Sequence, residues 1–232
     1  MKNWKKYSFE FLSIFTAVIL AFALNNWNEN RRNNNAKNKI LSEIYNGLNK
    51  DLEDFRMNES GHKLGIKSIV FFKNVLSNKL ESSDSVMFHY YHLTRDFISI
   101  QNTSGYEALK SKGLELIEND SLRSKIISLY EFDYSILKKL EEEYYESQFQ
   151  ENYFEKINQI IAENFILDKN KNIIGINIPL KVSESEEKIL LTYLWKIQVN
   201  RDFILGCYSD VISKTERIRN EIGKEIKESL KK

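Results

Sequence analysis

Two histidines and one aspartate, His89, His92 and Asp96, have the types and spacing that could hold a metal ion. In a helix, positions i, i+3 and i+7 lie on one face, so the two imidazoles and the carboxylate would point the same way. Such a set could bind zinc or iron and leave positions open for water or substrate. The competing interpretation is a polar helix face whose histidines meet solvent or a hydrogen-bond partner. Neither an H-E-x-x-H pattern nor a cysteine cluster supports the metal site.

A second candidate site lies further along the chain, where three basic residues could surround an anionic ligand. Lys110, Lys112 and Arg123 flank Asn119-Asp120-Ser121, which is typical of a helix start. The N-terminus of a helix favours anions, and arginine binds carboxylate or phosphate groups through its planar guanidinium.

The same stretch also has a purely structural interpretation. Tyr106 and Leu109 would pack in the core, and Gly113 would end a helix because glycine adopts the left-handed conformation without steric cost. Asp120 or Ser121 would then cap the next helix. We favour this interpretation, since each of these residues has a local conformational role.

Clustered glutamates, Glu141-Glu142-Glu143 and Glu146, could suggest paired carboxylates for acid–base chemistry. On a long helix such a cluster is usually a solvated face, and this is what we expect here. The sequence has no phosphate-binding glycine loop and no G-x-S-x-G pattern. Cys207 is the single cysteine, which cannot form an intrachain disulfide and is compatible with either redox compartment. The sequence therefore indicates no evident catalytic set, and it implies no cofactor.

An apolar stretch near the N-terminus, FLSIFTAVILAFALNNWN at residues 11–28, organises the chain. About 20 helical residues cross the roughly 30 Å hydrocarbon core of a bilayer, which matches the distance from Tyr7 to Trp27. Trp4 and Tyr7 at one end, and Trp27 at the other, are the aromatic residues that membrane interfaces favour. We predict a transmembrane helix. Glu10 lies about one turn from the Tyr7 end, so its carboxylate could reach the headgroups.

Two alternatives to a span stay open. A cleaved signal peptide would explain the lysines that precede an apolar run ending in Ala21-Phe22-Ala23, an A-x-A pattern. A buried core helix would explain why the part without strongly polar residues, Phe11 to Leu24, is only about 14 residues long. Glu10 and Trp27 favour the span over the signal peptide.

The orientation of the span in the membrane follows less directly from the sequence, because basic residues flank both of its ends. Three precede it and four follow it: Lys2, Lys5, Lys6, Arg31, Arg32, Lys37 and Lys39. The short lysine-rich tail also carries the free amine, which favours a cytoplasmic N-terminus. We therefore expect a single-pass membrane protein whose N-terminus is cytoplasmic and whose C-terminal domain is extracytoplasmic.

Composition limits the fold and the partners. The 232 residues suffice for one span and one further domain, and the net charge of +1 gives no basic face for nucleic acid. Eight glycines and one proline are too few for an all-β protein with many tight turns. The expected partners are the lipid bilayer and either another protein or a second copy of the chain.

Hydrophobic periodicity predicts helices along most of the chain. The first, over 40–55, could continue directly from the span. Gly61 and Gly65 bracket a second beginning, and Asp84 or Ser85 can cap a third helix. The alternation of isoleucine with Gly and Asn over 173–180 predicts an extended segment or short hairpin. The predicted helices after the first cover 66–76, 86–98, 106–112, 122–140 and 186–230, and the helix over 122–140 could run on through 161.

We therefore predict an all-α protein in which an N-terminal transmembrane helix is followed by an elongated antiparallel helical bundle. Residues 1–28 form the tail and the membrane anchor, 29–39 a polar juxtamembrane collar, and 40–232 the bundle domain. A helix as long as 122–161 is commoner in elongated bundles than in compact globules.

Two motifs resemble an uncharacterised bacterial family of single-span proteins. One is Asn25-Asn26-Trp27-Asn28-Glu29 after a span that contains Glu10. The other is Tyr106-Glu107-Ala108-Leu109-Lys110-Ser111, followed by Gly113-Leu114, Ile117 and Asn119-Asp120-Ser121-Leu122-Arg123. Together they cover roughly a quarter of the chain. Phe15 and Phe22 depart from the smaller aliphatic residues usual in that span. The resemblance implies an N-terminal anchor and a helical domain, and it implies no activity.

The leading functional hypothesis is a membrane-anchored interaction, scaffolding or sensory module, because long amphipathic helices occur without a convergent catalytic set. One alternative is a metal-dependent enzyme built on His89, His92 and Asp96. Another is a small-ligand sensor, since helical bundles can hold ligands between facing helices.

Overall fold

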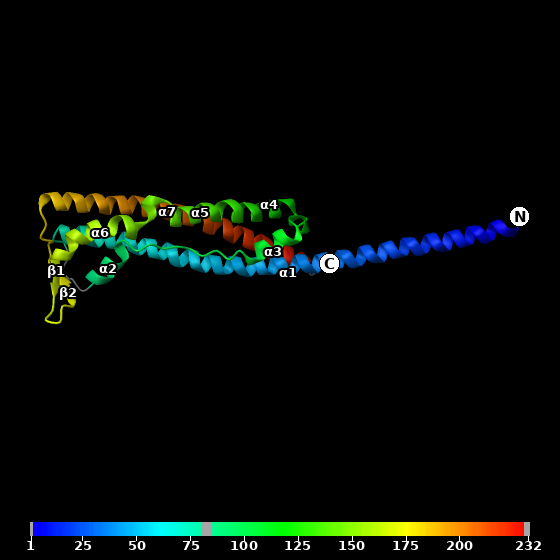
Figure 1. The fold of residues 1–232 in the computed structure, drawn as a ribbon, viewed down its shortest axis with the longest axis horizontal. Coiled ribbons are helices and arrows are strands. Elements are labelled where there is room, and N and C mark those ends of the chain that lie inside the picture. Colours follow the sequence, from blue (N-terminus) through cyan, green and yellow to red (C-terminus); the bar gives the residue numbers. More distant parts are fainter. Residues whose placement is uncertain (1, 80–84, 230–232) are drawn as a thin grey trace.

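The computed structural model describes residues 2–79 and 85–229, and the protein is mostly helical (Figure 1). A long N-terminal helix packs along a long C-terminal helix, with shorter helices and one small hairpin beside them, so the predicted helical bundle is confirmed at this level. The elements are α1 (Lys2–Leu76), α2 (Val86–Leu93), α3 (Ser104–Lys112), α4 (Asp120–Ser128), α5 (Tyr134–Glu142), α6 (Phe149–Ile161), β1 (Phe165–Leu167), β2 (Ile173–Ile176) and α7 (Glu184–Ser229).

α1 is one unbroken helix of 75 residues, and its N-terminal part projects alone beyond the rest of the molecule (Figure 1). The predicted new helix after Gly61 and Gly65 is wrong. A Cβ atom on Gly61 would stand 2.2 Å from a ring carbon of Phe97, and one on Gly65 would stand 2.4 Å from Nε of Arg201. These glycines therefore allow close approach of other elements to a continuous helix, and they do not end one.

The projecting part of α1 is the one helix in the described ranges that is long and apolar enough to cross a membrane. Its most apolar window has a mean hydropathy of 1.9 and no buried residue. A membrane span or a signal sequence near the N-terminus would both meet this description. The helix continues through 29–39 into the bundle, so the asparagine-rich collar is helical and contains no break.

α7 runs antiparallel to α1 and is 46 residues long, which confirms the predicted C-terminal helix. A capping box starts it: the Ser183 N–H and hydroxyl donate to Glu186, and the Glu186 N–H points back to the Ser183 hydroxyl. α1 and α7 pack more extensively against each other than any other pair of elements. Their facing apolar residues form the centre of the core and include Leu41, Ile44, Leu48, Phe55, Ile204, Tyr208, Ile218 and Ile222.

The third side of the bundle is formed by α4, α5 and α6, where the sequence predicts a helix over 122–140 that could run on through 161. The helix from Leu122 to Leu140 is confirmed, since a π-helical turn at Leu129–Asp133 joins α4 to α5 without a gap. Its extension through 161 is wrong, because a 3₁₀ turn at Tyr145–Ser147 separates α5 from α6. No proline or glycine marks this break. Instead the Gln148 side chain donates to the Glu141 carbonyl at the end of α5. Asp96, from a distant segment, accepts from the Phe149 N–H at the start of α6.

α2 ends at Leu93 instead of continuing to Ile98 as predicted. Arg201 donates to the carbonyl groups of Leu93 and Arg95, which in a longer helix would accept from residues four positions later. Residues 94–103, here called the connecting segment, run in non-helical conformation from α2 to α3. Of the two predicted caps of this helix, Ser85 makes no capping bond and Asp84 lies outside the described residues.

The predicted extended stretch is confirmed over Ile173–Ile176, which pairs in antiparallel fashion with Phe165–Leu167. Asp168 accepts hydrogen bonds from the N–H groups of Asn170 and Asn172 and so closes the turn. Gly113 ends α3 as predicted, with a φ of +107° and its N–H bonded to the Leu109 carbonyl. The cap of α4 is Asn119, which accepts from the Leu122 N–H, and not Asp120 or Ser121.

Candidate functional site: a buried polar network around the connecting segment

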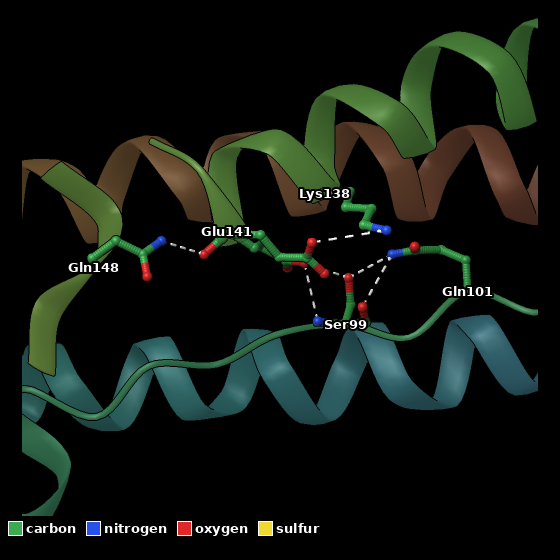
Figure 2. A network of polar contacts seen from close by, with 6 residues as sticks. Ser99, Gln101, Lys138, Glu141 and Gln148 are labelled. Atoms are coloured by element: carbon green, nitrogen blue, oxygen red, sulfur yellow. Dashed lines mark hydrogen bonds and ion pairs between the residues drawn. The ribbon is translucent and has the colours of Figure 1, made fainter. Parts of the chain in front are cut away.

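The connecting segment lies between α1 and α5 (Figure 2). It is not part of a β-sheet, so side chains of the neighbouring helices accept hydrogen bonds from its backbone N–H groups. The Ser99 N–H donates to Glu141 at 3.0 Å and the Ile100 N–H to Asp54 at 2.9 Å. The Asn102 N–H donates to Asp51 at 2.7 Å. Hydrogen bonds from backbone N–H groups to carboxylates are charge-assisted and stronger than neutral ones. Three carboxylates from two helices therefore fix one irregular segment.

Glu141 is the centre of this network, although its sequence context indicated a solvated face. Its side chain is 4% exposed, and its carboxylate also accepts from the Ser99 hydroxyl at 2.8 Å and from the Tyr208 hydroxyl. Burial raises the pKa of Glu141, and the hydrogen bonds from Tyr208 and Ser99 oppose that rise. One signal was present in the sequence: Glu141 follows Tyr134 and Leu137 on the buried face of α5. The expectation is correct for Glu142 and Glu143, which are exposed.

Asp51 on α1 is the second buried carboxylate, with 1% of its surface exposed. Besides the Asn102 N–H, it accepts from the Tyr134 hydroxyl at 2.9 Å. Burial raises the pKa of Asp51 to about 6, because the charged form is poorly solvated there and its hydrogen bonds compensate only in part. The aspartate therefore changes charge in a physiological pH range.

Arg201 of α7 lies fully buried against His62 of α1, with 3.0 Å between Nη1 and Nδ1. Its guanidinium also lies 4.1 Å from the ring centre of Phe149. Among the described residues, no carboxylate oxygen lies close enough to the Arg201 guanidinium, 4.0 Å or less, to form an ion pair with it. Carbonyl groups and aromatic rings take the place of a counter-ion.

The protonation state of His62 follows from this contact. Arginine only donates, so Nδ1 of His62 accepts and Nε2 carries the proton. Burial and the neighbouring guanidinium lower the pKa of His62 to about 3, whereas burial lowers the pKa of Arg201 to about 9. At neutral pH the pair is therefore a neutral imidazole beside a charged guanidinium. No motif in the sequence indicated either residue.

The predicted metal-binding residues are not brought together. His89 Nδ1 lies 3.2 Å from the Ser68 hydroxyl, and its ring stacks on Phe71 at 4.2 Å. His92 Nδ1 lies 2.8 Å from the carbonyl of its own helical turn. Asp96 lies beyond the end of α2, so the prediction that it shares a helix face with His89 and His92 is wrong. Its carboxylate instead accepts from the Phe149 N–H and caps α6. The described part of the chain has no group of three or more His, Cys, Asp or Glu placed to hold a metal ion.

Two of the three predicted anion-binding residues pair with carboxylates of the protein itself. Lys110 pairs with Glu131 at 3.1 Å, while Arg123 pairs with Asp120 at 2.7 Å and with Glu115 at 3.0 Å. Lys112 is exposed at the end of α3. The structural interpretation of this stretch is supported further by the burial of Tyr106 and Leu109, which are 3% and 0% exposed.

The three predicted membrane-interface residues all lie on the projecting part of α1. Trp4, Tyr7 and Trp27 are 79%, 63% and 61% exposed. Arg31 lies one turn beyond Trp27, with its guanidinium 5.8 Å from the Trp27 ring centre. The aromatic residues thus stand at the two ends of an exposed apolar helix.

A cleft of about 370 Å³ lies over the polar network, between the connecting segment and α5. Gln101, Lys138 and Glu142 line it. Gln101 donates to the Ser99 side chain (Figure 2), and Lys138 pairs with Glu142 at 3.8 Å. Their polar atoms are thus engaged with one another or with the segment. The network holds the connecting segment in place through hydrogen bonds to carboxylates. No family model, no curated protein and no solved structure matches this chain.

Proposed function

We propose that this protein is a single-pass membrane protein that uses a rigid helical bundle to bind another protein. The observation that carries the proposal is the continuity of α1, whose exposed apolar N-terminal part and core-packed C-terminal part form one helix. A helix with no break transmits position and rotation from one end to the other. This favours a scaffolding or sensory role over an enzymatic one.

The free energy of burial supports insertion of the projecting part into lipid. Ten of its large apolar side chains are exposed: Phe9, Phe11, Leu12, Ile14, Phe15, Val18, Ile19, Leu20, Phe22 and Leu24. Moving such side chains out of water contributes about 1.5–3 kcal/mol each, so the set is worth on the order of 20 kcal/mol. A hydrocarbon core supplies that environment, and the aromatic residues at both ends suit its interfaces.

The proposed orientation has the N-terminus in the cytoplasm of a bacterial cell and the bundle outside it, anchored in the inner membrane. The short lysine-rich tail before the span supports this orientation, because translocating a charged tail with a free amine is costly. Lys37, close after the span, is 7% exposed and pairs with Glu225 at 3.6 Å. This leaves fewer free basic charges on the bundle side.

Protein binding is supported by apolar side chains that the bundle leaves exposed. Leu191, Trp195, Val199 and Phe203 recur every fourth residue along the outer face of α7, with exposures between 36% and 58%. We call these four residues the α7 ridge. Residues spaced by four form the rows through which helices commonly pack.

The first test is a topology assay on the full chain, with reporters active on opposite sides of the membrane fused after Lys232. An extracytoplasmic signal from membrane-bound, full-length protein supports the proposal. A cytoplasmic signal overturns the orientation, and a soluble, shortened product shows cleavage after Ala23 and overturns the anchor.

The second test addresses binding and uses chemical crosslinking of the full-length protein in its own membranes. A discrete complex with another protein, or with a second copy, is the expected result. Recovery of the uncrosslinked monomer alone, with crosslinker demonstrably active on a known membrane complex, contradicts the proposal.

A further inference from the structure

A pocket of about 530 Å³ opens between α2 and α6. These two helices lie at the end of the bundle opposite the projecting part of α1 (Figure 1). We call this the far end of the bundle. The volume lies within the range of about 300–1,000 Å³ that is typical of ligand sites. Met87, Tyr91 and Phe154 contribute most of its apolar wall, and Arg95 stands at its edge.

The floor of the pocket is held by contacts within the protein. The Tyr90 ring lies 5.1 Å from that of Phe165, and its hydroxyl donates to Asn158. The Thr94 hydroxyl donates to Gln150 at 2.9 Å. Because these polar atoms are engaged, the interior offers an apolar surface in a preformed shape. A bulky apolar side chain would fit it at little cost in reorganisation.

The edge of the pocket has the composition of a protein interface. Met87 and Tyr91 are 44% and 56% exposed, and the Arg95 guanidinium lies 4.6 Å from the Tyr91 ring centre. Methionine, tyrosine and arginine are enriched in interfaces, and tyrosine and arginine are also enriched at their energetic hot spots. The stacked Arg95 loses less side-chain entropy on binding than a free arginine would.

Apolar surface also continues outside the pocket. Phe88 is 48% exposed on the outer face of α2, next to Met87, and lies against the His92 ring at 4.3 Å. A small molecule confined to the pocket would leave this surface in water, whereas a protein segment would cover both. The bilayer that holds the span is out of reach, since the helix from Trp27 to Leu76 extends about 75 Å.

The charges beside the pocket define the partner further. Glu151 and Glu155 are exposed one turn apart on α6, each next to a pocket residue of the same helix, and neither forms an ion pair within the described residues. Glu151 is close enough to Asp96 to raise the pKa of that half-buried carboxyl group, in addition to the larger effect of partial burial. The edge is thus acidic on the α6 side, and Arg95 stands on the other.

We propose that this pocket is the docking site for a segment of another protein that carries a bulky apolar side chain with a lysine or arginine within one helical turn. The apolar side chain fills the pocket, its backbone neighbours cover Phe88, and the basic group pairs with Glu151 or Glu155. This assignment rests on the proposed function, because it names the surface and the partner chemistry through which the anchored bundle acts.

The test places a photo-activated crosslinking amino acid at position 88 of the full chain in its own cells, with position 57 as control. Met57 is 66% exposed on α1 and lies outside the pocket. The expected result is an adduct from position 88 and none from position 57. Mass spectrometry should locate the crosslink in a partner segment with a bulky apolar residue and a Lys or Arg within about four positions.

Charge reversal then tests the recognition. The double variant E151K/E155K should lower the yield of that adduct at least tenfold, and replacing the basic residue of the partner by Glu should restore it. Asp202→Lys is the matched control, since Asp202 is an exposed acid on α7 without an ion pair in the described chain. It should leave the yield unchanged.

Three outcomes would overturn the assignment: an adduct with a second copy of this chain, an adduct unaffected by E151K/E155K, or no protein adduct from position 88. A parallel crosslinker at Trp195 on the α7 ridge separates the two proposals. A protein adduct there without one at position 88 leaves protein binding intact and shows that the pocket is not its site. Adducts at neither position contradict both proposals.

Discussion

Gly65 of α1 and Arg201 of α7 approach so closely that a Cβ atom on Gly65 would stand 2.4 Å from the Arg201 Nε atom. The glycine lets the guanidinium lie flat against the helix, where it reaches His62 and the carbonyl groups that end α2. One missing side chain on the first helix thus makes room for a buried charge on the last. The fold depends on both residues.

Gly65→Ala should therefore destabilise the bundle by about 2–4 kcal/mol, because overpacking or displacement of Arg201 would cost its buried hydrogen bonds. The measurement is the free energy of unfolding in urea. Gly206→Ala on α7 is the matched control: nothing lies within 4 Å of its Cβ position. There the same substitution should stabilise the helix by about 0.5–1 kcal/mol. Equal effects at both positions would contradict the close approach.

Glu141→Ala should lower the free energy of unfolding by about 2–4 kcal/mol, since the Ser99 N–H, the Ser99 hydroxyl and the Tyr208 hydroxyl would lose their common acceptor. Amide hydrogen exchange at Ser99 should accelerate in the same variant. Glu143→Ala, two residues further on an exposed position, should change stability by no more than about 0.5 kcal/mol. If Glu141→Ala leaves the free energy of unfolding unchanged, Glu141 is solvated and does not hold the connecting segment.

Asp51 should make the bundle more stable at mildly acidic pH than at neutral pH. The pKa of Asp51 is about 6 in the folded protein and 3.8 for an ordinary aspartate, so the folded state binds the proton more tightly than the unfolded chain. This contribution is present at about pH 4 and is lost as pH rises through 6. A shift of about two pKa units corresponds to about 2–3 kcal/mol.

Asp51→Asn should remove this part of the pH dependence, because the amide can still accept from Asn102 and donate to Tyr134 but does not titrate. The comparison is the free energy of unfolding at pH 5 and pH 7.5 for both proteins. Glu141, whose pKa is also raised, adds a contribution of the same sign that should persist in the variant. A variant with the full wild-type pH dependence would show that Asp51 does not titrate in this range.

Val18→Arg should weaken membrane insertion, because Val18 lies near the middle of the exposed apolar part of α1. An arginine at the centre of a span costs about 2.5–3.5 kcal/mol on the insertion scale. The measurement is the fraction of protein that resists alkaline extraction from membranes. Val18→Leu should extract like the wild type. If both variants and the wild type are released equally, the helix does not span the bilayer.

Local sequence patterns were sufficient for the elements whose signals are short-range. The apolar run of α1, the periodicity of α7 and Gly113 at the end of α3 each depend on residues within a few positions of one another. Helix periodicity and capping act at that range, so these elements could be predicted without knowledge of the fold.

The tertiary structure alone decided which polar residues are buried and where helices stop for reasons other than their own sequence. Glu141 shares a helix face with Tyr134 and Leu137, but its burial as a charged group depends on hydrogen bonds from Ser99 and Tyr208. Likewise α2 ends where Arg201, more than 100 positions away, donates to the carbonyl groups of Leu93 and Arg95. A buried charge is stable only when other groups pair with it or form hydrogen bonds to it, and here those groups lie far apart in the chain. Their meeting depends on how α1 and α7 pack, which no local pattern encodes.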